Sequence, residues 1–429
     1  MLRLPGGSGA VLAYEPDSLQ PIDWQASGPV PAAAVPLGLD LDQRVVYYLD
    51  TRQRLIGLDL EARIARSFVE GTTRATVGPD GAAYAVDSTG KLVRIARRAA
   101  TTFPARFSAT PNALFGTQNG QVVALSRDSG PALRLLSVEQ SGDPIPLAGS
   151  LVAATYWGDL IAHATGRRLE LIRPGDPSQN RRAELPRDAR ALAFSPSGHR
   201  VYALTATEVI TFDRFSAERR GGISLPGQGA GLRVDPSGRW LLVQPESDDS
   251  VWIADLATSR LVLSAPTAWS GGLPAVAGAG TLLTSEGDDV LAWNLAAERP
   301  APVARVLGGA ADRWLPVAWV PPSRQATVQA ATQSAQLAQD SAIRAGPAAR
   351  STVSEVYLQV SSSQNPDWAD DLARQLSEAG HPAAVWTPAE PEESYRVVLG
   401  PYASRDEAEA AGRALGRPFF VVSGRPPRR

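Results

Sequence analysis

A tight-turn motif that recurs through the first two thirds of the chain constrains its fold more than any other feature. The motif reads Gly78-Pro79-Asp80-Gly81, Ser195-Pro196-Ser197-Gly198 and Asp235-Pro236-Ser237-Gly238. Pro196 and Pro236 lie 40 residues apart, and Pro79 precedes Pro196 by 117 residues, close to three such intervals. Proline fixes φ and glycine accepts a positive φ, so each copy predicts the end of one strand and a turn into the next.

A hairpin pattern follows the turns: a short apolar strand, a second turn and another strand, with a fourth strand behind, as at residues 260–264. The clearest copies cover residues 201–213, 240–255 and 281–294, and weaker ones cover 45–60, 82–95, 113–125 and 160–172. Four strands in about 40 residues, repeated along a chain, are typical of a β-propeller blade. Seven full copies fit between residues 33 and 307.

Two strand-like pieces remain outside these seven copies. Residues 9–14 with 19–24 resemble the end of a blade, and residues 315–320 resemble the start of one. Strands from both ends of the chain would remove the open sheet edges if they combined into a closing blade. We therefore expect an all-β propeller of eight blades over residues 1–322, with seven blades as the alternative. The repeats resemble WD40-like and YVTN-type propellers in general form, but they lack the Gly-His and Trp-Asp dipeptides of true WD40 repeats.

Residues 323–353 differ in composition, because Ala, Gln, Ser and Thr dominate and apolar anchors are few. This pattern predicts a linker. Residues 325–344 within it can form a helix that Gly346-Pro347 would end. The final residues, 425–429, predict a frayed tail.

Residues 354–424 predict a small α+β domain. The alternation at 355–360 indicates a half-buried strand, and the tight turn at Gly400-Pro401 separates a second such strand from a helix capped by Ser404. In chain order we expect a strand at 355–360, a helix from Asn365-Pro366 to Gly380, strands at 383–387 and 394–399, a helix from Ser404 to Gly416, and a strand at 419–422. This βαββαβ order is the split βαβ arrangement, in which the helices cover one sheet face and leave the other free.

Two stretches of this domain resemble a known family. Leu358-Gln359-Val360-Ser361-Ser362-Ser363 stands where SPOR domains have a Val-Gln-x-Gly-Ser-Phe pattern, and residues 395–402 read Tyr-Arg-Val-Val-Leu-Gly-Pro-Tyr where the family has Tyr-Arg-Val-x-Val-Gly-Pro-Phe. The segment thus resembles a SPOR domain, the peptidoglycan-binding repeat of bacterial cell-division and sporulation proteins. It departs from the family pattern at Ser361 and Ser363, where the family has Gly and Phe.

The resemblance implies a ligand and a site. SPOR domains bind peptidoglycan glycan strands that have lost their stem peptides, which accumulate at the division septum, and the ligand lies on the open sheet face. By strand alternation we expect that face to carry the following candidate glycan-binding residues: Tyr357, Gln359, Ser361, Arg396, Val398 and Trp386. Polar side chains of this kind suit sugar hydroxyl and N-acetyl groups, and an aromatic ring suits a pyranose face. Tyr395 and Tyr402 are expected in the core instead.

RNA binding is the alternative use of a βαββαβ sheet, and the charge of the domain argues against it. Residues 354–424 contain 5 Arg, no Lys and 11 Asp plus Glu. The net charge of the whole chain is −2. Phosphate binding requires the opposite sign, so we expect no nucleic-acid partner.

Catalytic and cofactor motifs are missing from the sequence. There is no cysteine, and His163, His199 and His381 lie in different repeats or domains. The acidic pairs Asp248-Asp249 and Asp288-Asp289 fall where blade hairpins turn, a common place for Asp. We therefore expect a protein that is not an enzyme and needs no cofactor or metal. The alternative is a propeller enzyme such as a cell-wall glycosidase, which would need two carboxylates converging about 5–9.5 Å apart.

A peptidoglycan ligand places the protein in the periplasm or cell envelope. No run of 18 apolar residues predicts a membrane span, and residues 1–7 do not read as a signal peptide, so we expect an export signal to have been removed. The alternative is a cytoplasmic propeller whose C-terminal domain has lost glycan binding. The propeller itself predicts a platform for a protein partner that the sequence does not identify.

Overall fold

The computed structural model describes residues 1–317 except 8, 41 and 279, and residues 356–363, 366–378, 380–387, 395–415 and 419–423. The chain divides into two compact units, Met1–Gln329 and Ala330–Arg429. The predicted linker at 323–353, with its helix at 325–344, and the predicted tail at 425–429 lie outside the described residues. Among the described residues, no helix has the length and apolar character needed to span a membrane.

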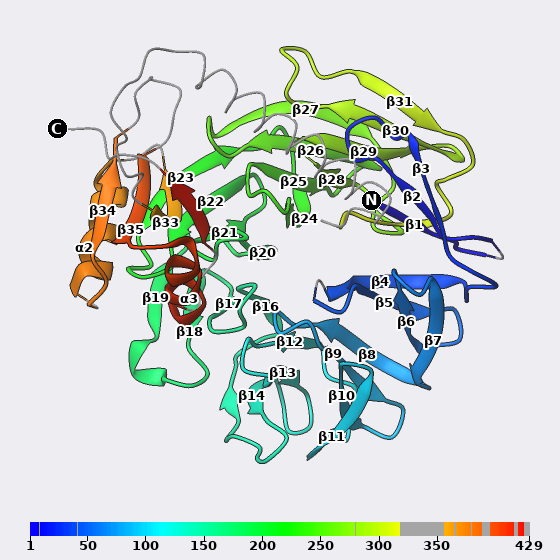
Figure 1. The fold of residues 1–429 in the computed structure, drawn as a ribbon, viewed down its shortest axis with the longest axis horizontal. Coiled ribbons are helices and arrows are strands. Elements are labelled where there is room, and N and C mark those ends of the chain that lie inside the picture. The colour runs from blue at the N-terminus through cyan, green and yellow to red at the C-terminus, as the bar shows by residue number, and fades with distance from the viewer. Residues whose placement is uncertain are drawn as a thin grey trace. The chain divides into compact units, whose positions relative to one another are not determined.

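The described strands of residues 1–317 form eight four-stranded antiparallel sheets, arranged as the blades of a propeller (Figure 1). Blade 1 contains β4 (Ala33–Asp40), β5 (Val45–Asp50), β6 (Leu55–Asp59) and β7 (Ile64–Val69); blade 2 contains β8 (Thr72–Val77), β9 (Ala83–Asp87), β10 (Lys91–Ala96) and β11 (Ala99–Arg106); blade 3 contains β12 (Ala113–Gly116), β13 (Val122–Ser126), β14 (Ala132–Leu136) and β15 (Ile145–Pro146). Blade 4 contains β16 (Leu151–Ala154), β17 (Ile161–Thr165), β18 (Arg168–Ile172), the 3-10 turn η1 (Pro177–Gln179) and β19 (Arg181–Glu184); blade 5 contains β20 (Ala191–Phe194), β21 (Arg200–Leu204), β22 (Glu208–Asp213) and β23 (Arg219–Ser224). Blade 6 contains β24 (Gly229–Val234), β25 (Trp240–Pro245), β26 (Ser250–Asp255) and β27 (Arg260–Pro266); blade 7 contains β28 (Ala275–Ala277), β29 (Thr281–Glu286), β30 (Asp289–Asn294) and β31 (Pro302–Val306).

Blade 8 closes the ring with strands from both ends of residues 1–317, as predicted. Its sheet order is β3 (Pro21–Gln25), β2 (Leu12–Tyr14), β1 (Leu2–Leu4) and β32 (Arg313–Leu315). Leu2 lies opposite Leu315 in the register, so the ring is held by backbone hydrogen bonds between its two ends. Two details differ from the prediction: the closing strand β32 ends at Leu315, the first residue of the predicted stretch 315–320, and β1 was not expected. Three residues are too few to display the period-two alternation by which a strand is recognised.

The first strand of each blade lies nearest the propeller axis, where it neighbours the first strand of the next blade (Figure 1). Because a blade has four antiparallel strands, an even number, the chain leaves each blade on the face where it came in. All eight inner strands therefore begin on one face of the propeller, which we name the start face. Its inner strands begin at Ala33, Thr72, Ala113, Leu151, Ala191, Gly229, Ala275 and Arg313.

The turns between first and second strands lie on the opposite face and have the geometry that the motif predicts. Gly81, Gly198 and Gly238 have φ of +75°, +71° and +76°.

The predicted strand positions at residues 113–125 were wrong. These residues form the first and second strands of blade 3, whereas the hairpin pattern predicted its second and third strands. The turn at residues 117–120 lacks the proline of the motif, so the sequence did not identify it as the turn between first and second strands.

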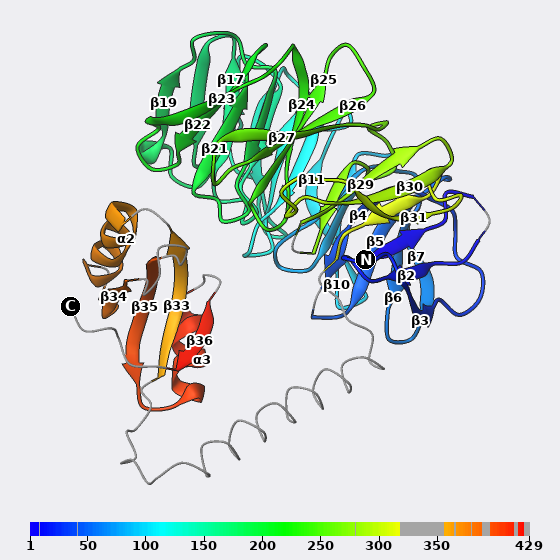
Figure 2. The ribbon, with the colours of Figure 1, turned by 90° about the horizontal axis from the view of Figure 1, so that it is seen from above.

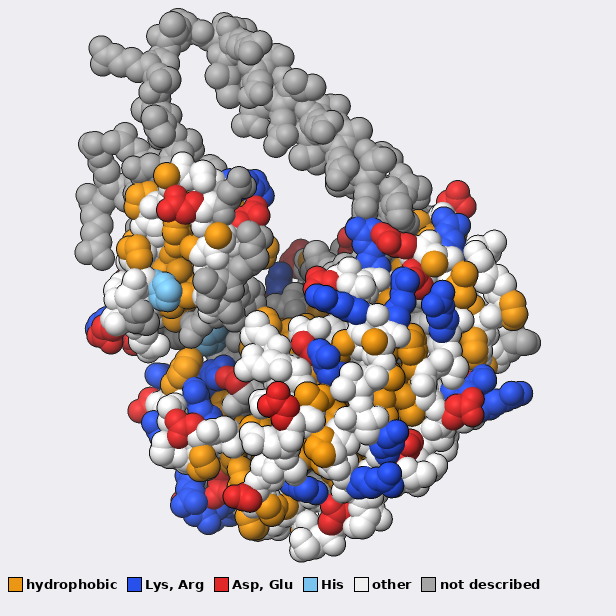
Figure 3. Space-filling view, turned by 60° about the horizontal axis from the view of Figure 1, so that its bottom comes forward, with side chains coloured by type: hydrophobic (Ala, Val, Ile, Leu, Met, Phe, Trp, Pro, Cys, Tyr) orange, Lys and Arg blue, Asp and Glu red, His pale blue; other side chains and the backbone are white. Residues whose placement is uncertain are grey.

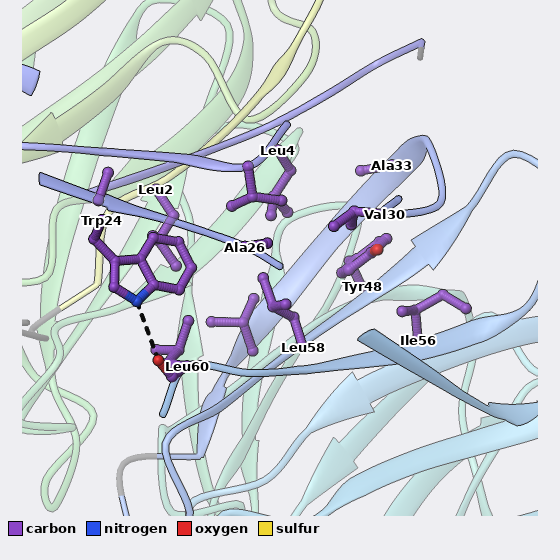
Figure 4. Packing of buried hydrophobic residues seen from close by; sticks show 13 residues of the cluster. Leu2, Leu4, Trp24, Ala26, Val30, Ala33, Tyr48, Ile56, Leu58 and Leu60 are labelled. Carbon is purple, nitrogen blue, oxygen red and sulfur yellow. Dashed lines mark hydrogen bonds between the residues drawn. The ribbon is translucent and has the colours of Figure 1, made fainter. Parts of the chain in front are cut away.

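The hydrophobic core consists of layers between neighbouring blades (Figure 4). In the layer between blades 8 and 1, the Trp24 indole donates a hydrogen bond to the Leu60 carbonyl oxygen at 3.1 Å, while Leu2, Leu4 and Tyr48 are buried beside it. Each layer joins residues distant in sequence, so the blades stabilise one another in a closed ring.

Blade 4 buries one histidine, and this predicts a pH dependence of stability. His163 is 3% exposed, its Nδ1 lies 3.7 Å from Glu170, and Glu170 also pairs with Arg168 and Arg182. Burial lowers the pKa of His163 from its ordinary 6.5, although Glu170 opposes this shift. The unfolded chain therefore binds the proton first, and stability present above about pH 6.5 falls as the pH decreases.

We expect the urea midpoint of the wild type to fall more between pH 7.5 and 5.5 than that of His163→Gln, which carries no titrating group at this position. His199→Gln is the matched control, because it removes another propeller histidine outside this cluster. Equal pH slopes for the wild type and His163→Gln would refute this assignment.

The second unit has the predicted βαββαβ order (Figure 2). It contains β33 (Val356–Ser363), α2 (Pro366–Glu378), β34 (Ala383–Trp386), β35 (Tyr395–Tyr402), α3 (Arg405–Leu415) and β36 (Phe420–Ser423), and its antiparallel sheet has the order β34-β35-β33-β36. Both helices pack on one sheet face, where Leu358, Val397 and Leu399 are buried against Leu372 and Ala408.

The helix ends of this unit follow the sequence signals. The Ser404 hydroxyl accepts from the Glu407 amide at 3.2 Å, which caps α3, and the Glu407 carboxylate accepts from the Ala403 amide at 3.0 Å. Gly380 follows α2 with φ +89°. The prediction of a tight turn at Gly400-Pro401 was wrong. β35 continues through both residues to Tyr402, and a shift in its register with β33 accommodates them. The predicted cap Asn365 and the stop at Gly416 lie outside the described residues.

Candidate functional site

The sheet face that the helices leave uncovered is the candidate site. Alternation along β33 and β35 turns Tyr357, Gln359, Arg396 and Val398 away from the helical layer, and Trp386 joins them from β34. We call this surface the open face. Tyr395 and Tyr402 pack with the core on the other side, as predicted.

A bulge in β33 changes one member of the predicted site. Gln359 lies opposite Val398, but Ser361 lies opposite Val397, so two residues of β33 match one step along β35. Val397 is buried under the helices, and the register therefore places Ser361 with that side. Ser362 instead lies opposite Arg396 on the open face and is exposed. The expectation that Ser361 shares a face with Gln359 is wrong, because the bulge breaks the alternation.

Two aromatic rings form the apolar centre of the open face. Tyr357 and Trp386 meet edge to face with ring centroids 5.1 Å apart, although β35 separates their strands. The rings must therefore pass over β35. Val398 lies on β35 opposite Gln359 of β33 and Ala384 of β34 and is 1% exposed. Tyr357 is also buried, at 5% exposed, so Tyr357 and Val398 support the half-buried Trp386 ring rather than offering contact surface of their own.

Polar donors surround this apolar centre. Arg396 is exposed and, within the described parts of the chain, no carboxylate lies within ion-pair distance of it. Gln359 is half-buried beside it on the neighbouring strand. The Trp386 indole N–H is buried and has no acceptor among the described residues. Buried polar groups are normally hydrogen-bonded, so this donor is suited to an acceptor that a ligand brings.

Sequence reasoning missed Phe420. It lies opposite Gln359 in the register of β36 with β33, and its side chain is 70% exposed. The sequence could have indicated this residue, because Phe419 and Phe420 are consecutive in a strand. Successive side chains of a strand point to opposite faces, so one of the two must point away from the core. Phe419 packs with the core, and Phe420 extends the apolar part of the open face.

The acidic pairs of the propeller lie in blade hairpins, as expected for turn residues. On the face of the propeller visible in Figure 3, basic and acidic side chains are interspersed. Within the hairpins, Asp248 accepts from the Ser250 hydroxyl at 2.5 Å, and Asp289 accepts from the Gly308 amide at 3.0 Å and pairs with Arg305 at 3.2 Å. The carboxylates of Asp248 and Asp289 thus have local hydrogen-bonding roles.

Comparison with solved structures relates the chain to propeller proteins. Similar structures include the dihydro-heme d1 dehydrogenase NirN in complex with DHE (14% identity, TM-score 0.51, covering 72% of this chain and 75% of that one). Apo AztD from Citrobacter koseri matches with 13% identity and TM-score 0.51 over 71% of this chain and 94% of its own. Kluyveromyces lactis Hsv2 matches with 10% identity and TM-score 0.50 over 62% and 96%. At these identities the likeness concerns the fold alone. Comparison with curated protein sequences gave no match.

Comparison with family models identifies the C-terminal unit. The SPOR domain model matches residues 353–421, which include all six predicted site residues. SPOR domains occur in cell-envelope proteins and bind peptidoglycan. Together with the eight four-stranded sheets of the described N-terminal residues, this match characterises the chain as a β-propeller followed by a SPOR domain.

Proposed function

We propose that this protein acts in the bacterial periplasm, where its SPOR domain binds peptidoglycan glycan strands that lack stem peptides and its propeller presents a protein-binding platform. The observation that carries the proposal is the open face of a SPOR domain, with a ring pair flanked by unpaired polar donors. Strands without stem peptides accumulate at the division septum, so the protein would be concentrated there.

The chemistry of the open face suits a polysaccharide. The half-buried Trp386 ring and the exposed Phe420 ring provide apolar surface for pyranose rings, while Tyr357 is buried and supports Trp386 from the side. Gln359 supplies both a donor and an acceptor for hydroxyl and N-acetyl groups. Arg396 adds five N–H donors that no described carboxylate engages. A flat face of this kind contacts a sugar chain from one side, so it requires no enclosed pocket.

The propeller has a binding role rather than a catalytic one in this proposal. In its acidic hairpin pairs, the Asp248 carboxylate accepts a local hydrogen bond and the Asp289 carboxylate accepts a hydrogen bond and pairs with Arg305, which favours a structural role for these two residues. Carboxylate pairs in glycoside hydrolysis act across a substrate cleft at about 5–9.5 Å. The partner that the platform holds at the septum would be a protein of the division machinery.

A co-sedimentation experiment with purified sacculi tests the proposed site. We expect Arg396→Ala and Gln359→Ala each to weaken binding of the full chain by about 5- to 10-fold, because each loses hydrogen bonds worth about 1 kcal/mol or more. Arg405→Ala is the matched control, since it removes an exposed arginine of the same domain from the helical layer. Equal loss in Arg396→Ala and Arg405→Ala would mean that only net charge matters, and unchanged binding in both open-face variants would refute the site.

A further inference from the structure

Five blades of the propeller have the same turn between their first and second strands, on the face opposite the start face. In blades 2 to 6, the amide of a glycine donates to the carbonyl oxygen three residues earlier, at 2.7 to 3.2 Å. The glycines have φ between +67° and +76°, and they are Gly81, Gly120, Gly158, Gly198 and Gly238. Because the backbone of the five turns agrees, their side chains can be compared position by position.

The turn of blade 4 differs from the other four in the two residues before its glycine. The other turns have proline or a polar residue at both positions, namely Pro79-Asp80, Gln118-Asn119, Pro196-Ser197 and Pro236-Ser237. Such residues favour a turn, because proline fixes φ and short polar side chains hydrogen-bond to the backbone. Blade 4 has Tyr156-Trp157 instead, and neither ring packs into the core layers on the two sides of this blade. A departure from local turn chemistry that adds nothing to the core is expected at a functional site.

The two rings present aromatic surface to the outside of the propeller. Tyr156 is 58% exposed and Trp157 is partly exposed. The rings meet edge to face, with centroids 4.9 Å apart and planes at 79°, so two ring faces stand nearly at right angles. The Trp157 indole N–H is not buried and has no acceptor among the described residues. The pair therefore offers apolar contact and one unused hydrogen-bond donor.

The neighbouring blades hold this turn in place. The Thr155 hydroxyl donates to Asp159 at 2.6 Å, and Asp159 also accepts from Arg214 of blade 5 at 2.5 Å. On the side of blade 3, a Cβ atom at Gly158 would lie 2.5 Å from the Gly116 carbonyl oxygen, so the two turns are in close contact. The ring pair is thus fixed before a partner arrives, which lowers the entropic cost of binding.

The chemistry beside the rings favours one class of partner. Arg214 compensates the charge of Asp159 and is itself only 9% exposed, so this surface offers no free cation to an acidic or nucleic-acid segment. A saccharide hydroxyl both donates and accepts, whereas the unused group here is a donor alone. A proline residue has a carbonyl acceptor and no N–H, and proline-rich segments in the polyproline II conformation dock on aromatic surfaces.

We propose that Tyr156 and Trp157 of blade 4 bind a proline-rich segment of a partner protein in the polyproline II conformation. The proline rings pack against the two ring faces, and the indole N–H donates to a carbonyl oxygen of the segment. This inference rests on the protein-binding role proposed for the propeller and gives that role a surface and a kind of partner. It does not require glycan binding by the SPOR domain.

Fluorescence anisotropy with the full chain tests the inference. The probes are a labelled peptide of ten prolines, which adopts the polyproline II conformation, and a labelled peptide of the same length with alternating Gly and Ser. We expect the proline peptide to bind and the Gly-Ser peptide not to bind. The double variant Tyr156→Pro/Trp157→Ser gives blade 4 the turn sequence of blades 5 and 6, and it should weaken peptide binding by about tenfold or more.

Two further measurements on this variant separate a binding role from a structural one. Its urea midpoint should equal or exceed that of the wild type, because its new residues favour the turn. Its sedimentation with sacculi should be unchanged, so a failure of peptide binding and a failure of glycan binding are read separately. The matched control is Val303→Ser/Leu307→Ser, which removes two exposed apolar side chains of blade 7 and its exit, and it should bind the proline peptide like the wild type.

Several results would overturn the proposal. These are equal binding of both peptides, wild-type binding by Tyr156→Pro/Trp157→Ser, or a lowered urea midpoint of that variant, which would assign the rings to stability. Displacement of the bound peptide by a hexamer of N-acetylglucosamine would assign the ring pair to saccharides instead.

Discussion

Replacing Trp314 with alanine is expected to destabilise the propeller by about 3–5 kcal/mol, the usual cost of truncating a fully buried tryptophan. Trp314 is 0% exposed in the short strand that closes the ring. Its indole donates to the Gly309 carbonyl oxygen at 2.8 Å, and its ring packs against Tyr14 with centroids 5.4 Å apart. The variant loses this packing at the point where both ends of the ring meet.

Urea denaturation followed by far-UV circular dichroism measures this loss. Leu307→Ala is the matched control, because Leu307 lies close in sequence but is 75% exposed, and its truncation should change stability by less than about 0.5 kcal/mol. Trp314→Phe should fall between the two, since it keeps an aromatic ring but leaves the Gly309 carbonyl without its donor. A Trp314→Ala variant as stable as the wild type would contradict closure through β32.

Replacing Trp386 with alanine is expected to weaken binding to sacculi by about thirtyfold, which corresponds to about 2 kcal/mol for an aromatic residue at the centre of a binding surface. The change removes the ring that meets Tyr357 at 5.1 Å and uncovers Val398 beneath it. It also removes the indole N–H that has no acceptor among the described residues. A sedimentation isotherm with sacculi measures the effect.

Two further variants separate the contributions of ring and donor. Trp386→Phe retains apolar surface and should recover part of the affinity, whereas Phe215→Ala removes a partly exposed aromatic of the propeller and should leave sacculus binding unchanged. Binding by Trp386→Ala at wild-type strength would remove the ring pair from the site.

The repeating parts of the fold were predictable from sequence because local chemistry specifies them. Gly81, Gly198 and Gly238 take the positive φ that their turn motif demands, so the 40-residue interval identified the blades. The capping residue Ser404 likewise located the start of α3. In contrast, β1 at Leu2–Leu4 is a strand because β2 and β32 pair with it, and a three-residue stretch carries no periodic signal.

The candidate site was predictable only where strand alternation holds. Gln359 and Arg396 lie on the open face as expected, but the bulge that moves Ser361 is defined by pairing with β35, which sequence does not display. The contact between Tyr357 and Trp386 depends on the sheet order, since the two strands are not neighbours.

The measurement that tests the central claim most directly compares binding of the full chain to sacculi before and after an amidase has removed the stem peptides. If the open face binds bare glycan strands, the amount of protein bound at saturation should rise as stem peptides are removed, and Arg396→Ala should lower binding to both preparations. Binding that stays constant or falls on stripping, or that is absent from both preparations, would contradict recognition of bare glycan by this SPOR domain.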